Sequence, residues 1–451
     1  MVRASQTLAC AASPAERVHH CAEADADDEL TPEERRRKKV RRAKRGVRSE
    51  LSVSGGDWTR HGYATSDLLR SEDVVDSLPR VDVRRVSLSD FVERFEKPRR
   101  PCVLTHATDG WPAAPGGCRA WSLASLRERF GSHKFKVGSD DDGYAVRLKM
   151  SHFHDYVLDK SEGAPVDDSP LYVFDGTYGD REGSRALLDD YQVPPYFRED
   201  LFSGCGEGRR PPYRWVVFGP ARSGSSLHID PLATSAWNAL LVGRKRWALL
   251  PPSVPRADCK PRIPGVTDGE GATWFKHVLP RTRAADWPHA RPLEAVQQAG
   301  EVMFVPNGWW HAVLNLEHTV AVTQNYVSSA NFDAAWRHTR VARPRLCQRW
   351  AAWLKDRRPD LSVRAEALDA AGLGDVSESS PSSSSSSSSS ESEGSDGEPP
   401  SLCADAPPPA SPSRKRIAPP PFAPVTAGDA GAAEQGASWR RRCPEEAMHA
   451  H

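Results

Sequence analysis

The sequence contains no long apolar run, no paired-cysteine motif and no secretory leader. In 451 residues, no apolar stretch approaches the ~18 residues that a membrane-spanning helix needs. Nine cysteines are scattered without any Cys-x-x-Cys pair, which argues against a zinc module and for a reducing compartment. The N-terminus lacks a signal-peptide core. We therefore expect a protein of a reducing compartment that makes no contact with a membrane.

The net charge of +1 conceals a strongly basic segment, because residues 35–48 contain ten lysines and arginines and no acid. Thr31, Pro32 and Glu34 stand just before it in the pattern of a capped helix start. A helix this basic is typical of a nuclear-import signal or a nucleic-acid-binding patch. A merely solvated helix is disfavoured, because the run itself holds no acidic partner. We expect residues 31–55 to form a basic helical arm with one of these two roles, and direct binding of RNA through residues 35–48 is a separate hypothesis.

The two ends of the chain have little apolar material to bury. Residues 382–390 are an unbroken serine run flanked by acidic residues, and a proline- and alanine-rich stretch follows. Such composition is typical of disorder and offers sites for phosphorylation or binding. We expect residues 1–30 to be a disordered extension and residues 375–451 to be a disordered tail.

A histidine and an aspartate two positions apart are the most informative feature. His228 and Asp230, joined by His311 at 81 positions beyond Asp230, form the two-imidazole, one-carboxylate set that leaves open positions on Fe(II). On a strand, His228 and Asp230 would share one face. Each part alone is weak, since His-x-Asp arises roughly once by chance among this many histidines. His311, beside two tryptophans, could equally be a core histidine.

Short apolar segments with glycine and proline punctuation surround these residues. They span residues 214–218, 227–230, 235–241, 245–250, 301–305, 311–316 and 319–326. Many short strands of this kind predict a double-sheet jelly roll, mainly β with added helices. We place the barrel at residues 182–346. Mixed patterns at residues 56–181, with helical spacing at 88–95 and 121–130 and strands at 101–105 and 171–174, predict elements that wrap it.

Strand alternation predicts a polar lining for the barrel. Asn238 lies on the face opposite Trp237, and Thr323 shares a face with Asn325. Lys245 stands among apolar residues, which costs free energy unless an anion pairs with it. An unaccompanied lysine usually reaches solvent instead. Beside a metal triad, a dicarboxylate cosubstrate is the natural counter-ion.

Two further segments allow two interpretations each. Asp140, Asp141 and Asp142 could form an acidic entrance for a cationic substrate, but a solvated turn is the favoured interpretation.

After residue 331 the sequence pattern becomes helical, with an apolar stripe that includes Leu346, Trp350, Trp353 and Leu354. It predicts C-terminal helices at residues 347–374 that either pack onto the barrel or form a homodimer interface.

Longer strings give a resemblance to a known family. Residues 222–232, 234–240 and 305–311 resemble the Jumonji-C oxygenases, and more narrowly the bifunctional arginine demethylases and lysyl-hydroxylases among them, which are nuclear enzymes. Shorter strings that also fit are 57–61, 141–144, 168–172 and 209–215, together with the polyserine tail. The resemblance covers roughly residues 35–390 and implies a cupin-like, double-stranded β-helix barrel.

The resemblance also implies a site. It assigns iron to His228, Asp230 and His311. It assigns 2-oxoglutarate to Lys245, Thr323, Asn238, Tyr172 and Ser225, where Ser225 replaces the threonine usual in the family. Asn325 matches a position near the substrate amide. The cofactors implied are Fe(II), 2-oxoglutarate and O2.

The expected function is hydroxylation of lysine side chains to 5-hydroxylysine in nuclear proteins, including splicing regulators and histone tails, with a role in chromatin and mRNA splicing. Demethylation of methyl-arginine uses the same site and stays open beside it. The expected location is the nucleus, with the cytoplasm as a second compartment. Two alternatives remain: a non-catalytic nuclear scaffold for RNA or splicing factors, and a Zn or Mn enzyme with non-oxidative chemistry. The full ligand set together with Lys245 argues against both.

Overall fold

The computed structural model describes residues 30–264 and 270–372, so the expectations for the two ends of the chain fall outside the described residues. None of the helices in these ranges is both long and apolar enough to cross a membrane.

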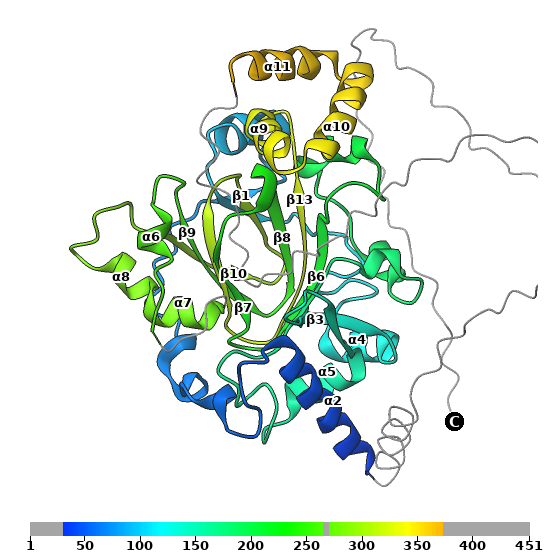
Figure 1. Ribbon diagram of the computed structural model, residues 1–451, viewed down its shortest axis with the longest axis vertical. Coiled ribbons are helices and arrows are strands. Elements are labelled where there is room, and N and C mark those ends of the chain that lie inside the picture. The colour runs from blue at the N-terminus through cyan, green and yellow to red at the C-terminus, as the bar shows by residue number, and fades with distance from the viewer. Residues whose placement is uncertain (1–29, 265–269, 373–451) are drawn as a thin grey trace, which may run out of the picture. The chain divides into compact units, whose positions relative to one another are not determined.

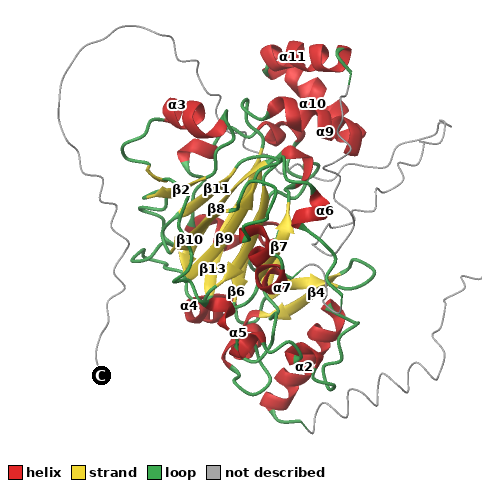
Figure 2. Cartoon of the chain, turned by 90° about the vertical axis from the view of Figure 1, so that its left-hand side faces the viewer, coloured by secondary structure: helices red, strands yellow, loops and turns green. Residues whose placement is uncertain are grey.

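Two sheets form the barrel (Figures 1 and 2). The larger sheet contains, in spatial order, β1 (Arg80–Asp82), β2 (Cys102–Thr105), β11 (Val302–Val305), β8 (Ser235–Val242), β13 (Thr319–Tyr326), β6 (Arg214–Gly219) and β5 (Val173–Asp175). The smaller sheet contains β10 (Leu293–Gln298), β9 (Arg244–Leu250), β12 (Trp310–Asn315) and β7 (Gly224–His228). Apolar side chains of both sheets meet in one buried cluster, which includes Ala236, Met303, Trp247 and Val313. The jelly roll is confirmed.

One strand ends earlier than the sequence predicted. Residues 227–230 were expected to be a strand, but β7 ends at His228 and Asp230 caps the short 3-10 turn η9 (Pro231–Ala233). The cause is local, because Pro231 has no N–H to continue a ladder. Asp230 nevertheless keeps an extended backbone, with φ −65° and ψ 141°. It therefore stays close to His228 without belonging to the strand.

The basic segment begins as the sequence predicted. Helix α2 (Pro32–Val47) carries a capping box in which the Thr31 hydroxyl accepts from the Glu34 N–H at 3.2 Å and Glu34 accepts from the Thr31 N–H at 2.8 Å. The helix covers only part of residues 31–55. It packs against α5 (Met150–Leu158) and the hairpin of β3 (Lys134–Ser139) and β4 (Ala145–Lys149).

Many of the other N-terminal elements cover the outer face of the larger sheet, whereas Tyr63 and Leu68 pack with the smaller sheet and Leu201 and Phe202 pack with the C-terminal helices. Phe130, Phe135 and Phe153 pack in one cluster with Trp237 and Phe218 of that sheet. The helices here are α3 (Leu88–Phe91), continued by the π-helical turn η4 (Val92–Glu96), and α4 (Leu123–Phe130). The 3-10 turns are η1 (Asp57–Thr59), η2 (Tyr63–Thr65), η3 (Asp67–Leu69), η5 (Tyr178–Asp180), η6 (Arg185–Asp190), η7 (Pro195–Phe197) and η8 (Leu201–Cys205).

The remaining helices lie after β9 and after β13. Between β9 and β10 are α6 (Arg256–Cys259), α7 (Gly271–His277) and α8 (Leu279–Arg283). The C-terminal helices are α9 (Phe332–Ala342), α10 (Pro344–Arg357) and α11 (Pro359–Ala370), so the helical segment begins at residue 332 and the expected boundary at 346 falls inside α10. Trp350 is fully buried against Phe202 and Phe332. The stripe packs onto the body of the protein, and the homodimer stays a prediction.

Candidate metal centre

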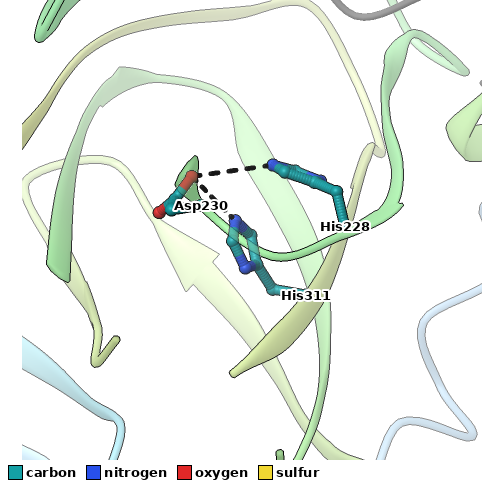
Figure 3. A group of neighbouring side chains, drawn as sticks. All are labelled: His228, Asp230 and His311. Carbon is teal, nitrogen blue, oxygen red and sulfur yellow. Dashed lines mark ion pairs between the residues drawn. The ribbon is translucent and has the colours of Figure 1, made fainter. Parts of the chain in front are cut away.

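The sheet register brings the two histidines together. His311 on β12 lies directly opposite His228 on β7, and their ring centroids are 4.1 Å apart. Asp230 Oδ1 lies 3.9 Å from Nε2 of each histidine (Figure 3). One ligand atom from each residue falls within 4.8 Å of the others, and among the residues of the two described ranges this is the one group of three histidine, cysteine or acidic side chains so arranged.

Each histidine is held in the tautomer that a metal ligand needs. Nδ1 of His228 donates to the Ser226 carbonyl at 2.8 Å, and Nδ1 of His311 donates to the Trp309 carbonyl at 3.1 Å. The lone pair therefore lies on Nε2, the atom that faces Asp230. Burial, together with the neighbouring His311, lowers the pKa of His228 to about 4, so the imidazole is neutral near pH 7.

Asp230 completes a set that fits a divalent metal. Its Oδ2 is buried and has no hydrogen-bond partner within the described parts of the chain. A buried carboxylate oxygen without a partner costs free energy. A metal ion at this point would satisfy it, and the mixed nitrogen and oxygen donors suit Fe(II) with open positions left over.

Lys245 offers a positive charge inside the barrel. The residue is 2% exposed, and Nζ contacts Asn238 Oδ1 at 3.4 Å. Burial lowers the pKa of the Lys245 ammonium to about 7, and among the described residues no carboxylate offsets this loss of solvation. A buried cation in this state is suited to receive an anionic ligand. The alternative that Lys245 reaches solvent is wrong.

Of the other expected cosubstrate residues, Asn238 and Thr323 lie beside this charge. Thr323 pairs with Asn238 across β13 and β8, and its hydroxyl donates to the Trp237 carbonyl at 2.8 Å. That hydroxyl must rotate before it can donate to an anion. Tyr172 and Ser225 meet through their hydroxyl groups, and burial raises the pKa of Tyr172.

Asn325 faces the same side as Thr323, as alternation predicted. Its side-chain amide donates to the Thr234 hydroxyl at 3.0 Å. That bond leaves the carbonyl oxygen of the Asn325 amide to accept from a substrate.

Sequence reasoning missed two buried amides that flank Lys245. Asn315 on β12 and Gln297 on β10 lie directly opposite Lys245 in the sheet. Gln297 is fully bonded, since it accepts from Trp247 at 2.8 Å and donates to the Asn238 carbonyl at 2.8 Å. Asn315 donates to Ser223 at 2.8 Å, whereas its Oδ1 is buried without a partner in the described chain. The alternation of β12 from His311 to Asn315 could have identified this residue.

The acidic triplet is part of a turn. Asp140 and Asp141 lie between β3 and β4, where Asp140 accepts from the Tyr144 N–H at 2.8 Å and Asp141 accepts from the Ser49 hydroxyl at 2.6 Å. These bonds fit the turn interpretation and give no support to an acidic entrance.

Comparison with known proteins agrees with this geometry. Residues 88–332 match the cupin-like domain family. The chain is 43% identical to the bifunctional arginine demethylase and lysyl-hydroxylase psr-1 of Caenorhabditis elegans over 346 residues, which are 76% of this chain and 83% of that protein. An arginine-specific demethylase of Arabidopsis thaliana is 42% identical over 252 residues, 55% of this chain and 46% of its own length.

A 2-oxoglutarate and iron-dependent oxygenase of Homo sapiens is 32% identical over 270 residues, 56% of this chain and 61% of its own length. The jelly-roll fold, the two-histidine, one-aspartate centre and these similarities agree. The chain therefore belongs to the cupin-like family, in the Jumonji-C group that contains the bifunctional arginine demethylases and lysyl-hydroxylases.

Proposed function

We propose that this chain is an Fe(II)- and 2-oxoglutarate-dependent dioxygenase that hydroxylates lysine side chains in nuclear proteins. The observation that carries the proposal is the buried, unneutralised Lys245 in the same barrel as the metal centre. A metal set alone would suit many reactions. A metal set with a buried cation suits a cosubstrate that chelates the metal at one end and carries a carboxylate at the other.

Different residues would hold the metal and the cosubstrate. His228 and His311 would hold the metal through Nε2, and Asp230 through a carboxylate oxygen. Lys245 would pair with the distal carboxylate of 2-oxoglutarate, and further amides and hydroxyls would contact the cosubstrate: Asn238, Thr323, Tyr172 and Ser225. Fe(II) with 2-oxoglutarate and O2 supplies the oxidation of a substrate C–H bond to an alcohol, with the cosubstrate converted to succinate and CO2.

The barrel contributes orientation and exclusion of water. Strands β8, β9 and β12 are buried along nearly their whole length, which keeps the reacting groups away from bulk solvent. Asn325 lies on the inner face of β13 with its amide carbonyl available, and we assign it to the substrate main chain. The protein thus fixes which substrate carbon meets the metal.

The substrate is proposed from chemistry that the relatives share. The name of the Caenorhabditis elegans relative joins lysyl hydroxylation with arginine demethylation. Both reactions oxidise a C–H bond on a cationic side chain. On a lysine methylene the alcohol is stable, whereas on an N-methyl group it breaks down to formaldehyde. We propose lysyl hydroxylation of Lys/Arg-rich nuclear proteins, such as splicing regulators and histone tails, as the main activity, and demethylation as the second.

Mass spectrometry tests the proposal. Lys/Arg-rich peptides, some with methyl-arginine, are incubated with the full-length protein, Fe(II) and 2-oxoglutarate. Gain of one oxygen atom on lysine supports the hydroxylase, and loss of a methylene with release of formaldehyde supports the demethylase. His228→Ala is the control and should abolish either product. If 2-oxoglutarate binds but no peptide changes, the proposed substrate is wrong. If 2-oxoglutarate does not bind, the oxygenase proposal is wrong.

A further inference from the structure

The inner face of helix α2 is a row of ion pairs. Basic side chains three or four residues apart meet acids from later in the chain: Arg37 with Asp159 at 3.3 Å, Arg41 with Glu162 at 2.6 Å, Lys44 with Asp167 at 2.7 Å and, at the C-cap position, Arg48 with Glu270 at 3.0 Å. Arg37 also pairs with Glu33 of the helix itself at 3.0 Å. The first three acids follow α5, which lies beside α2 (Figure 1). The fourth acid is different, because Glu270 comes from the segment that adjoins the metal-bearing sheet.

Arg48 joins two segments that are far apart in the sequence. One of its guanidinium nitrogens donates to the Ser169 carbonyl at 2.7 Å and also lies 3.0 Å from Glu270 Oε1. The guanidinium stacks over Trp58 with its carbon 4.7 Å from the ring centroid. The Arg48 side chain is 15% exposed and that of Glu270 is 10% exposed. The planar guanidinium of Arg48 contacts both partners at once. The ammonium group of a lysine would do so less well.

Both segments lead directly to the cosubstrate pocket. Ser169 is three residues before Tyr172. Glu270 forms an antiparallel bridge with Ser225 on β7. Next to it, Gly271 lies so close to the sheet that a Cβ would come within 2.6 Å of the Val313 carbonyl and 3.2 Å of the Ser225 nitrogen. The backbone that carries Ser225 is therefore directly linked to the position of Glu270.

We propose that Arg48 is a positioning residue for the cosubstrate end of the site. It holds the segment of Tyr172 against the segment of Ser225, so that their hydroxyl groups meet beside the pocket. This inference rests on the proposed function, which assigns both hydroxyls to 2-oxoglutarate. It makes the end of the basic helix part of the active-site framework, in addition to any role in nuclear import or RNA binding.

The first test needs no cosubstrate. Amide hydrogen exchange is measured on the full-length protein, on Arg48→Ala and on Arg41→Ala, a matched control that removes an exposed ion pair of the same helix face. Arg48→Ala should speed amide exchange in residues 168–172 and 224–228. Without the contacts of Arg48 to Ser169 and Glu270, both segments should open locally more easily. The control should leave both segments unchanged. Unchanged exchange in Arg48→Ala would overturn the proposal whether or not 2-oxoglutarate binds.

The second test separates positioning from general instability. In Arg48→Ala, KM for 2-oxoglutarate and its Kd should rise about tenfold or more, as is typical when a supporting contact behind a ligand-binding group is lost. The kcat at saturating 2-oxoglutarate should change much less. Arg48→Lys should recover part of the affinity. An equal fall of kcat in all variants with KM unchanged would contradict a positioning role.

If Arg48→Ala does not fold, Glu270→Gln removes the charge and keeps the shape. It should also raise KM for 2-oxoglutarate and speed exchange at residues 224–228, and normal values of both would overturn the proposal. Failure of the wild-type protein to bind 2-oxoglutarate would instead refute the proposed function. The exchange result would still decide whether Arg48 joins the two segments.

Discussion

Single residues in the site carry polar atoms that the described chain leaves without partners. Asp230 Oδ2 and Asn315 Oδ1 are buried without hydrogen bonds, and Lys245 is a buried cation without a carboxylate. Each costs stability in the ligand-free protein. Functional sites commonly trade stability for binding in this way. The three atoms point to the same explanation, a metal and an anion that fill the barrel.

Lys245→Met should therefore raise stability and abolish cosubstrate binding. The substitution removes a buried charge and keeps an apolar stem, so the melting temperature should rise by about 2 °C or more. Calorimetry should detect no binding of 2-oxoglutarate, while the metal still binds. Lys276→Met, at a surface lysine paired with Asp67, is the control and should leave cosubstrate affinity unaltered. Retained 2-oxoglutarate affinity in Lys245→Met would contradict the assigned role of Lys245.

The same lysine predicts a pH dependence. The pKa of Lys245 is about 7 in the folded protein, below its unfolded value of about 10.4. Between these values the unfolded chain binds a proton that the folded chain has lost, so the contribution of Lys245 to stability rises with pH across that window. Affinity for 2-oxoglutarate should fall as pH rises above about 7, because the free protein loses the charge that binds the anion. Denaturant titration across this pH window measures the trend in stability, and calorimetry measures the trend in 2-oxoglutarate affinity. The rise in stability that Lys245 causes should be absent in Lys245→Met.

At the scale of elements, helix α2 has two basic faces with different environments. The inner face is paired with acids, as described above. The outer face carries the exposed side chains of Lys39, Arg42 and Arg45. The sequence could predict the helix from its capping box. It could not predict the pairing, because the acids lie more than 110 positions away in the chain.

If α2 binds RNA, the outer face should account for it. Replacing Lys39, Arg42 and Arg45 together with alanine should weaken binding of single-stranded RNA and reduce the slope of log affinity against log salt by about two, because each phosphate contact on a single strand contributes about 0.7. Filter binding at several salt concentrations measures both. Arg41→Ala, on the inner face, should leave the salt dependence nearly unaltered. Equal affinity in the triple variant would exclude this face as the RNA site.

The C-terminal helices depend on a buried tryptophan. Trp350 packs against Trp336 and Phe202 and is fully buried. Trp350→Ala should lower the free energy of unfolding by about 3–5 kcal/mol, because it leaves a large cavity. Val363→Ala, at an exposed position of α11, should change it little. Denaturant unfolding gives both values, and a loss below 1 kcal/mol for Trp350→Ala would contradict this packing.

For the whole molecule, the sequence predicted most strands of the barrel, because glycine or proline marks many of their ends, but it did not predict β10. It also predicted the metal set, although the strand argument for Asp230 was wrong in detail: Pro231 ends the ladder and the extended backbone keeps the carboxylate in place. Asn315 and the Arg48–Glu270 pair escaped notice for another reason. Their roles depend on neighbours that only the fold brings close. Asn315 lies opposite Lys245 in the sheet, and Glu270 forms a bridge with Ser225.

The proposed function requires the metal centre to insert oxygen from O2 into a lysine side chain. Isotopically heavy dioxygen tests it most directly, with a Lys/Arg-rich peptide, Fe(II), 2-oxoglutarate and mass spectrometry of the peptide and of succinate. We expect heavy oxygen in both products from the wild-type protein, whereas His228→Ala should form neither product. Hydroxylated peptide that carries only light oxygen from water, or product formed without 2-oxoglutarate, would contradict it.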